Sequence, residues 1–404
     1  MDKNNGAIYD ARKLGKPKMI ILGVQHMFAM FGATILVPIL TGLDISTTLL
    51  MAGLGTLLFH CITKFKVPAF LGSSFAFLGG YAAIKAFSPN DPNSMLPYAC
   101  LGVACAGLIY FILAAVIKAV GIEKVMRFFP PVVTGPIIIA IGLGLAPSAV
   151  SNCTTNWFLA VVALAVIVVF NIWGKGMAKI IPIILGLLIS YGTGLVLYFI
   201  SQANPDLIQN VPWLFAGGAD ANGVYQPIFD FTSLNTICDN ISKGHIFGSE
   251  GLIGIPIHWD KTVFGGIDYS NGALIASSII AIVPIAFATM MEHIGDICAI
   301  SSTTGNNYIK DPGLHRTLVG DGLATTLASL FGGPANTTYG ENTGVLALTR
   351  VYDPRVIRIA AYFAVAVSFF PIVSVIIGSI PSCIIGGISF VLYGMISALS
   401  LIHI

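Results

Sequence analysis

Long apolar stretches separated by short polar segments run through almost the whole chain, and this pattern constrains the fold more than any other feature. A helix that crosses a lipid bilayer needs about 20 mostly apolar residues. Of the 404 residues, 56% are hydrophobic and 9% are charged, whereas soluble domains carry about 25% charged residues. So few charges cannot cover a soluble surface. The composition predicts a polytopic membrane protein and excludes a cytosolic enzyme, a nucleic-acid-binding protein and a disordered chain.

Twelve stretches are candidate membrane crossings, so the predicted fold class is an all-α polytopic membrane protein. They are residues 19–40, 46–63, 67–86, 97–119, 125–147, 157–174, 178–200, 272–298, 314–332, 334–350, 356–378 and 382–400. The third and tenth are poor helix formers because they are rich in glycine, serine, threonine and proline. Residues 201–271 form the one long hydrophilic segment, which we interpret either as a folded extracellular cap or as a mobile loop.

The positions of the basic residues predict the orientation. If the N-terminus is cytoplasmic and each crossing reverses the chain, 17 of the 20 Lys and Arg residues fall on the cytoplasmic side. Lys243 and Lys261 stay outside, and Lys85 lies near a helix end. Residues 1–18 are polar and basic, so we expect them to be a cytoplasmic lead into a retained helix. The predicted location is the cell inner (plasma) membrane.

Four acidic residues remain at membrane depth once the loops are removed: Glu292, Asp296, Asp321 and Glu341. Inserting such a residue costs about 2.5–3.5 kcal/mol, so it marks function by default. Glu292 and Asp296 are four apart and share one helix face. Neighbouring carboxylates repel, so one should hold a proton, which can couple proton binding to ligand binding. Alternatively, the pair lies hydrated at a cytoplasmic helix end, Asp321 is structural, and His293 is a satisfied interior histidine.

Two predicted crossings contain segments unsuited to a helix, Val67–Phe77 and Gly333–Gly344. Extended backbone at membrane depth persists only where it is buried in protein or lines a cavity. Paired broken segments in two halves of a transporter point to a substrate site at the midplane. Seven crossings precede the long loop, so the second half is inverted. We therefore expect an inverted repeat in which Ser74 and Phe75 face Tyr339, Gly340 and Glu341, although the serines could simply pack helices together.

The sequence offers little for catalysis or metal binding. The seven cysteines form no CxxC pair and no His–Cys cluster. A nucleophile–base pair is missing as well, so we expect neither an enzyme nor a metal or organic cofactor. The expected organisation is a first repeat at 19–200, an outer loop at 201–271 and a partial second repeat at 272–398.

The segment Glu341-Asn-Thr-Gly-Val-Leu-Ala-Leu-Thr-Arg350 resembles the signature of the nucleobase–ascorbate transporters, the nucleobase:cation symporter-2 family. The signature reads [Q/E]-N-x-G-x-x-x-x-T-[R/K]. Matches to the family also occur at Gln25–Thr34, Leu71–Phe77, Asp311–Arg316 and Asn336–Asn342. The resemblance covers the chain to about residue 398 and looks most like the bacterial uracil-transporting members, since xanthine and urate carriers typically have Gln at position 341.

The resemblance implies a proton-coupled symporter of seven plus seven inverted spans, with short strands in spans three and ten. It also implies core and gate domains and a homodimer in the lipid bilayer. Uracil would lie against Ala33, Phe75, Tyr339 and Tyr393. Glu292, Glu341 and the backbone N–H groups of Phe75 and Gly340 would bind its polar edge, with Ser74 nearby. The proton would be the coupling ion, handled by Glu292, Asp296, Glu341 and Asp321.

The chain departs from the family pattern in two places. Uracil carriers commonly show E-H-x-G-H, and here Asp296 replaces the second His, as in purine-type relatives. A xanthine or purine permease is therefore an alternative, as is an anion transporter of the same fold, whose ligand would need basic groups or helix N-termini. The chain also stops after the twelfth candidate crossing, which suggests truncation. Residues 399–404 (LSLIHI) back-translate to CTG TCT CTT ATA CAC ATC, which resembles a sequencing adapter, so we expect a non-native tail.

Overall fold

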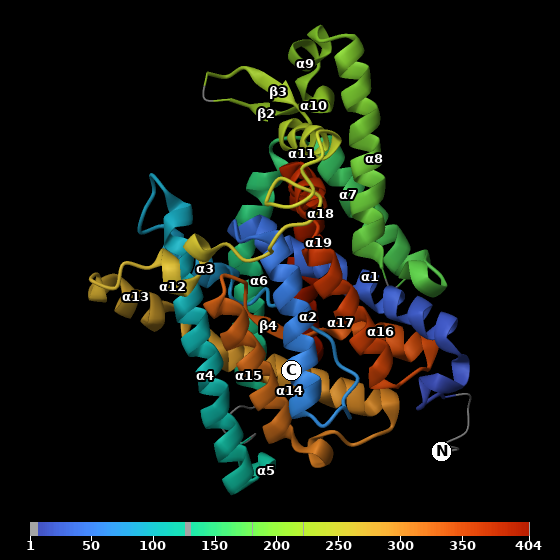
Figure 1. The fold of residues 1–404 in the computed structure, drawn as a ribbon, viewed down its shortest axis with the longest axis vertical. Helices are drawn as coiled ribbons and strands as arrows, with labels where there is room; N and C mark the ends of the chain where they lie inside the picture. Colours follow the sequence, from blue (N-terminus) through green and yellow to red (C-terminus); the bar gives the residue numbers. More distant parts are fainter. Residues whose placement is uncertain (1–6, 126–130, 180, 221, 404) are drawn as a thin grey trace. The chain divides into compact units, whose positions relative to one another are not determined.

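The computed structural model describes residues 7–125, 131–179, 181–220 and 222–403 (Figure 1). The chain forms two compact units, and each unit combines two separate stretches. Unit 1 contains Met1–Thr134 and Ile255–Phe370, and unit 2 contains Gly135–Gly254 and Pro371–Ile404. The units therefore do not follow the two halves of the chain, because each draws on both.

In the described part of unit 1, the regular structure is helical apart from two short strands. Its helices are α1 (Lys16–Thr41), α2 (Ile45–Ile62), α3 (Leu78–Lys85), α4 (Leu96–Val120), α5 (Ile122–Val125), α12 (Val263–Gly266), α13 (Gly272–Ile282), α14 (Ile285–Thr304), α15 (Leu314–Leu330), α16 (Gly340–Thr349) and α17 (Pro354–Ser368). Its strands are β1 (Leu71–Ser73) and β4 (Asn336–Thr338). Local signals set the boundaries: α1 ends at Gly42 with φ +85°, and Asp44 then caps α2 through the N–H of Thr47 at 2.8 Å.

Small residues let α4 and α15 pack closely in the core of unit 1. A Cβ on Gly322 would lie 2.5 Å from the Cβ of Tyr110 and 2.6 Å from the carbonyl oxygen of Gly107. Glycine at both helices removes the side chains that would hold the backbones apart. Asp321, the residue before Gly322, is fully buried next to this contact.

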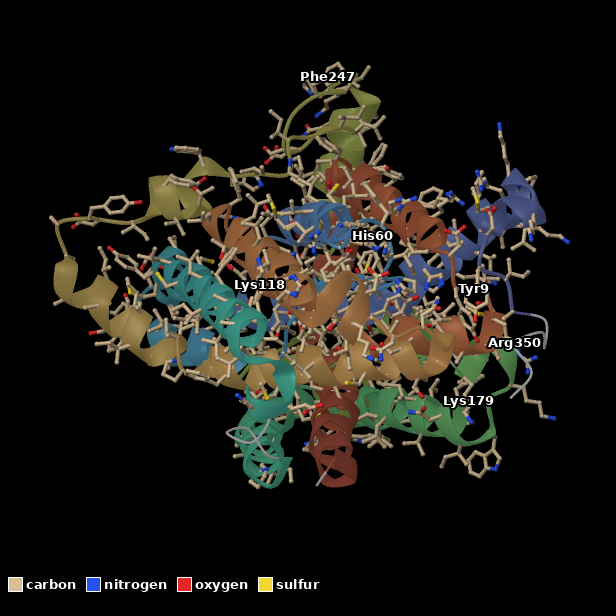
Figure 2. All side chains as sticks on the ribbon, turned by 90° about the horizontal axis from the view of Figure 1, so that it is seen from below. Tyr9, His60, Lys118, Lys179, Phe247 and Arg350 are labelled. Atoms are coloured by element: carbon tan, nitrogen blue, oxygen red, sulfur yellow. The ribbon has the colours of Figure 1, made fainter. Side chains whose placement is uncertain are left out.

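The N-terminal segment is bound to the same unit. The N–H of Ile8 donates to the carbonyl of Arg350 at 2.8 Å, and the N–H of Tyr352 donates to the carbonyl of Ile8 at 2.8 Å. The hydroxyl of Tyr9 donates to the carbonyl of Thr304 at 2.7 Å. Figure 2 shows Tyr9 and Arg350 on these neighbouring segments. Residues 7–14 are thus part of the folded unit.

Unit 2 consists of α6 (Pro131–Cys153, which begins in unit 1), α7 (Trp157–Trp173), α8 (Pro182–Ala203), α9 (Asp206–Asn210), α10 (Pro212–Phe215), α11 (Thr232–Ser242), α18 (Pro371–Gly378) and α19 (Ser382–His403). The strands β2 (Ala216–Ala219) and β3 (Tyr225–Pro227) pair antiparallel. The part of the long hydrophilic segment in this unit is therefore folded, and its extracellular position stays a prediction. Its aromatic cluster joins Tyr191 and Tyr198 of α8 to Phe229 and Phe231.

Helices occur at all twelve predicted stretches, but not all of them are long. Among the described residues, five helical segments have the length and composition to cross a membrane: Lys16–Thr41, Ile45–Ile62, Pro92–Val120, Pro182–Ala203 and Gly272–Thr304. The stretch 356–378 is not one helix as expected. Phe369 and Phe370 separate α17 from α18, which begins at Pro371, because proline cannot donate the hydrogen bond that would continue the helix.

Two predicted segments have other boundaries in the structure. The stretch expected at 125–147 is the helix α6 at Pro131–Cys153, and residues 126–130 lie outside the described part. The expected tail at 399–404 belongs to α19 as far as His403. The side chains after Gly394, and residue 404 itself, lie outside the described part of the structure.

Candidate functional site

The two segments that resist helix formation pair with each other. In the ribbon of β1 and β4, Leu71 lies opposite Thr338, Gly72 opposite Thr337, and Ser73 opposite Asn336, with the strands antiparallel. The N–H of Ser74 extends the pairing to the carbonyl of Ala335 at 2.8 Å. The two strand-like runs are therefore short strands that pair antiparallel, and their place on two sides of a ligand pocket stays a prediction. Glycine and proline keep these segments out of a helix, so their backbone N–H and C=O groups need other hydrogen-bond partners. The pairing of the two strands supplies them.

Each strand leads into a helix that starts close by. Strand β1 is followed by α3 and β4 by α16, which begins at Gly340, and no side chain caps either helix N-terminus. The first N–H groups of a helix have no acceptor within it and carry the positive end of its dipole. Because the strands are antiparallel, the two helix N-termini approach the ribbon from opposite ends. Donors at these positions suit a ligand group that accepts hydrogen bonds, whether a carbonyl oxygen or an anion.

Tyr339 fastens the ribbon to α1. Its hydroxyl donates to the carbonyl of Ser73 at 2.9 Å and accepts from the hydroxyl of Thr34 at 3.4 Å. Three of the predicted ligand-contacting residues, Ala33, Phe75 and Tyr339, belong to one apolar cluster. Ala33 and Tyr339 are buried and Phe75 is half-buried. The structure therefore brings two of the three predicted aromatic residues, Phe75 and Tyr339, into one cluster.

The carboxylate of Asp296 lies at the same place. It accepts a hydrogen bond from the hydroxyl of Thr338 at 2.8 Å. A Cβ built on Gly340 would lie 3.8 Å from Oδ1 of Asp296, so the acid is beside the start of α16. Glu292 lies one turn earlier on α14 and is exposed. The side chain of Glu341 lies outside the described part of the structure, although its backbone forms the first turn of α16.

A buried acid–histidine pair lies behind the ribbon. Nδ1 of His293 is 3.1 Å from Oδ2 of Asp321, and both side chains are 0% exposed. The same nitrogen is 3.5 Å from the hydroxyl of Thr338. Asp321, His293, Thr338 and Asp296 thus form a continuous polar path from the interface of α4 and α15 to the ribbon. His293 is interior as expected, but its partner was not predicted, and its Nε2 has no hydrogen bond among the described residues.

A second polar contact joins two of the sequence motifs. The amide of Asn342 donates to the carbonyl of His26 at 3.2 Å and lies 3.3 Å from Nδ1 of the same histidine. Both side chains are buried. His26 belongs to Gln25–Thr34 and Asn342 to the signature segment. Sequence reasoning did not place His26, Asn342, Thr34 or Thr338 in the site, although all four lie inside the quoted motifs.

The remaining predicted residues are less informative. Ser74 is buried, and its hydroxyl has no hydrogen bond among the described residues. Tyr393 is buried on α19 of unit 2. Within the described ranges, no group of three or more His, Cys, Asp or Glu side chains could hold a metal ion.

Comparison with protein families gives a match along almost the whole chain. The model of a family described as "Permease family", with the short name Xan_ur_permease, matches residues 17–404. The chain belongs to this permease family. Its members are transporters, and the predicted family is therefore confirmed.

Curated relatives of this permease agree with the match. The uracil permeases of Bacillus caldolyticus and Bacillus subtilis (strain 168) are each 37% identical over 94% of this chain and 78% of their own length. The putative pyrimidine permease RutG of Escherichia coli (strain K12) is 35% identical over 97% of this chain and 79% of its own.

Solved structures of distant transporters share the fold of this permease. The transmembrane domain of the cyanobacterial bicarbonate transporter BicA aligns with a TM-score of 0.62 at 15% identity, over 98% of this chain and 91% of that domain. SLC26A9 aligns with a TM-score of 0.53 at 11% identity, over 96% of this chain and 59% of its own. At these identities the likeness shows the fold alone.

Proposed function

We propose that this permease imports uracil across the cytoplasmic membrane together with a proton. The observation that carries the proposal is the ribbon of β1 and β4, beside which Phe75, Tyr339 and the carboxylate of Asp296 lie. The curated relatives named uracil permease support the choice of substrate.

The geometry suggests how uracil would bind. The planar ring would stack against Phe75 and Tyr339, with Ala33 leaving room beside them. The N–H groups at Phe75 and Gly340 would donate to the ring carbonyls. The carboxylates of Glu292 and Glu341 would accept from the ring N–H groups, and such charge-assisted bonds are stronger than neutral ones. A ligand lacking these groups would leave buried polar atoms unpaired and bind poorly.

The polar path behind the ribbon suggests where the proton acts. Glu292, Asp296 and Glu341 would lie near the ligand, and Asp321 would lie deeper, paired with His293. Thr338 contacts both Asp296 and His293, so a proton taken up on one group changes the hydrogen bonds of β4. Protonation would favour the ligand-bound, outward-open state, and a ligand shifts the equilibrium only through such differential affinity.

The architecture supporting this cycle would be an inverted repeat of seven plus seven spans. The antiparallel pairing of β1 with β4 supports it, since the two segments come from the two halves of the chain. The two compact units would be the core and gate that move against each other. The N-terminus would be cytoplasmic, as the basic residues predict, and the permease would work as a homodimer.

An anion transporter of the same fold is the second candidate, because the fold matches a bicarbonate transporter. The acidic residues argue against it. Asp296 of α14 lies beside the start of α16, where an anionic ligand would have to bind, and Glu292 lies one turn earlier on α14. A carboxylate in that position would repel an anion.

Ligand binding to the purified permease tests the proposal. A ligand at about 100 times its Kd stabilises the folded state by about 2.7 kcal/mol. We therefore expect uracil to raise the apparent melting temperature by several degrees, and xanthine and bicarbonate to raise it less. A larger shift with xanthine would favour a purine permease. A shift with bicarbonate alone would contradict the nucleobase assignment.

A further inference from the structure

Two polar side chains of α2 hold the chain that leads into β1. The N–H of Leu71 donates to the hydroxyl of Thr56 at 2.9 Å. One turn later on α2, Nε2 of His60 (Figure 2) lies 2.9 Å from the carbonyl oxygen of Ala69. Thr56 and His60 are four residues apart, so they share one face of the helix. Both are 0% exposed, so neither contact competes with water.

The contact of His60 with Ala69 determines where the imidazole carries its proton. A carbonyl oxygen only accepts hydrogen bonds, so in the neutral ring Nε2 carries the hydrogen and donates it to Ala69. Nδ1 is then an acceptor, and it has no hydrogen bond among the described residues. His60 therefore acts through one donor, held at a fixed distance from α2.

The turn between His60 and Ala69 has an unfavourable backbone conformation. Lys64 and Phe65 have φ angles of +56° and +57°, in the left-handed region that residues with a Cβ rarely adopt. Such a conformation persists only where the surrounding structure holds it. The path of the chain from α2 to β1 therefore depends on contacts that hold this turn.

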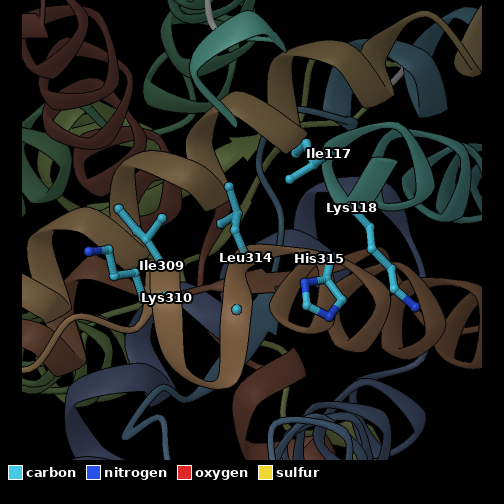
Figure 3. A pocket seen from close by; sticks show the side chains of 7 residues that line it. Ile117, Lys118, Ile309, Lys310, Leu314 and His315 are labelled. Atoms are coloured by element: carbon cyan, nitrogen blue, oxygen red, sulfur yellow. The ribbon is translucent and has the colours of Figure 1, made fainter. Parts of the chain in front are cut away.

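Two further contacts hold the turn, and both are exposed. The guanidinium of Arg358 lies 4.8 Å from the ring centre of Phe65, which is 50% exposed. Lys66 pairs with Asp311, and these side chains are 45% and 68% exposed. Asp311 lies in the segment before α15 that Figure 3 shows beside a cavity of about 250 Å³. Exposed contacts of this kind contribute little, whereas a buried carbonyl without its donor is costly. The bond from His60 is therefore the stronger restraint.

The residue after Ala69 connects this restraint with the candidate substrate site. The carbonyl of Phe70 accepts a hydrogen bond from the N–H of Tyr339 at 3.0 Å. Strand β1 begins at the next residue, Leu71, and pairs with β4. A shift of Ala69 would therefore displace both the backbone that holds Tyr339 and the strand that leads to Phe75.

We propose that His60 is a positioning residue for the substrate site. Its Nε2–H holds Ala69 and so sets where β1, and the N–H of Phe75 beyond it, lie against β4. This inference rests on the proposed function, in which the N–H of Phe75 binds the ligand. His60 itself acts on the backbone ahead of β1, not on the ligand.

Three substitutions at His60 separate the position of the donor from polarity and folding. His60→Gln keeps an N–H at about the reach of Nε2, His60→Asn moves it back to the reach of Nδ1, and His60→Leu removes it. The matched control is Thr63→Val at the end of the same helix. Thr63 is buried, and its hydroxyl donates to carbonyls of α2 itself.

Two measurements follow the variants in the purified or membrane-embedded permease. Hydrogen–deuterium exchange of residues 67–77 without ligand reports how firmly β1 is held, and the concentration dependence of uracil uptake gives KM and the maximal rate. We expect His60→Leu and His60→Asn to speed exchange in this segment and to raise KM about tenfold, with a smaller change in the maximal rate. We expect His60→Gln and Thr63→Val to behave as the wild type does.

Unchanged exchange and KM in His60→Leu would overturn the proposal, and so would equal defects in His60→Gln and His60→Asn. If His60→Leu does not reach the membrane, the comparison of the Gln and Asn variants decides. A wild type that takes up no uracil would contradict the proposed function alone, because exchange without ligand still shows whether His60 positions β1.

Discussion

At the scale of single residues, Gly72 fits tightly against Tyr339 in the candidate site. A Cβ on Gly72 would lie 2.8 Å from the hydroxyl oxygen of Thr34 and even closer to the ring of Tyr339. The backbone of β1 can reach α1 and β4 only because this position has no side chain. The position of the Tyr339 ring, and with it the aromatic wall of the site, depends on this glycine.

Replacing Gly72 with Ala should therefore displace Tyr339 and lower uracil uptake about tenfold, since overpacking costs about 1–3 kcal/mol. The matched control is Gly79→Ala on α3, where a Cβ would meet nothing within 4 Å. The measurement is the initial rate of radiolabelled uracil uptake, normalised to the amount of permease in the membrane. Equal rates for the two variants would show that the packing of Tyr339 is unimportant.

Replacing Glu341 with Gln should lower uracil uptake about tenfold or shift selectivity toward xanthine, because an amide forms weaker bonds to ring N–H groups than a carboxylate does. Competition by unlabelled xanthine against labelled uracil measures the shift. Glu123→Gln on α5 serves as the control carboxylate. If Glu341→Gln leaves both uptake and selectivity unchanged, the carboxylate does not bind the substrate.

The site could be predicted from sequence only in part. Phe75 and Tyr339 were predictable because both follow segments that cannot form helices, and paired broken segments mark a site. The pairing of His293 with Asp321 was not predictable. The two residues lie on different helices, and spacing along one helix says nothing about which residue of another helix faces it.

At the scale of elements, α17 depends on one buried acid at its start. Asp353 is 4% exposed, accepts from the N–H of Arg355 at 2.9 Å as the helix cap, and accepts from the N–H of Ala11 at 2.7 Å. It therefore joins the N-terminal segment to α17. Asp10 next to it is paired with Arg12 and Arg355 on the surface.

Replacing Asp353 with Ala should lower stability by about 1–3 kcal/mol, because it removes a helix cap and leaves a buried N–H without an acceptor. The apparent melting temperature of the purified permease measures the loss. Asp10→Ala should have a smaller effect, since exposed ion pairs contribute little. A larger loss for Asp10→Ala would contradict the central position of Asp353 in this contact.

The pairing of Asp10 with Arg12 has a defined dependence on pH. The hydrogen bond from Arg12, which outweighs a weaker opposing effect of desolvation, holds the pKa of Asp10 below its usual range. A lowered pKa in the folded state stabilises the protein at neutral pH, and the stabilisation is lost only as the pH falls through the carboxyl range. The pairing of Asp10 should therefore not change between about pH 6 and 8.

The apolar pattern of the sequence predicted where helices occur, but it did not predict how long each helix is. All twelve stretches contain helix because each has enough apolar residues in sequence. The break at Phe369–Phe370 was missed, since proline also occurs inside helices here, as Pro38 does in α1. Whether a proline breaks a helix depends on the neighbours that satisfy the freed carbonyl groups.

At the scale of the whole molecule, the two compact units each combine both halves of the chain. The hydropathy pattern indicates the two halves of the chain, since the hydrophilic segment 201–271 divides the apolar stretches into two groups. It could not indicate which helices pack together, because that depends on contacts between distant segments, such as Gly107 of α4 with Gly322 of α15. The resemblance to a family, rather than the pattern of spans, supplied the expectation of two domains.

Proton-coupled uracil transport is the central claim, and uptake into cells lacking their own uracil carrier tests it most directly. The permease is expressed, its amount in the membrane is measured, and radiolabelled uracil uptake is followed with and without a proton ionophore. We expect saturable accumulation that unlabelled uracil inhibits more strongly than xanthine and that the ionophore abolishes. No uptake above that of cells without the permease, despite folded protein in the membrane, would contradict uracil transport, and accumulation unaffected by the ionophore would contradict the coupling.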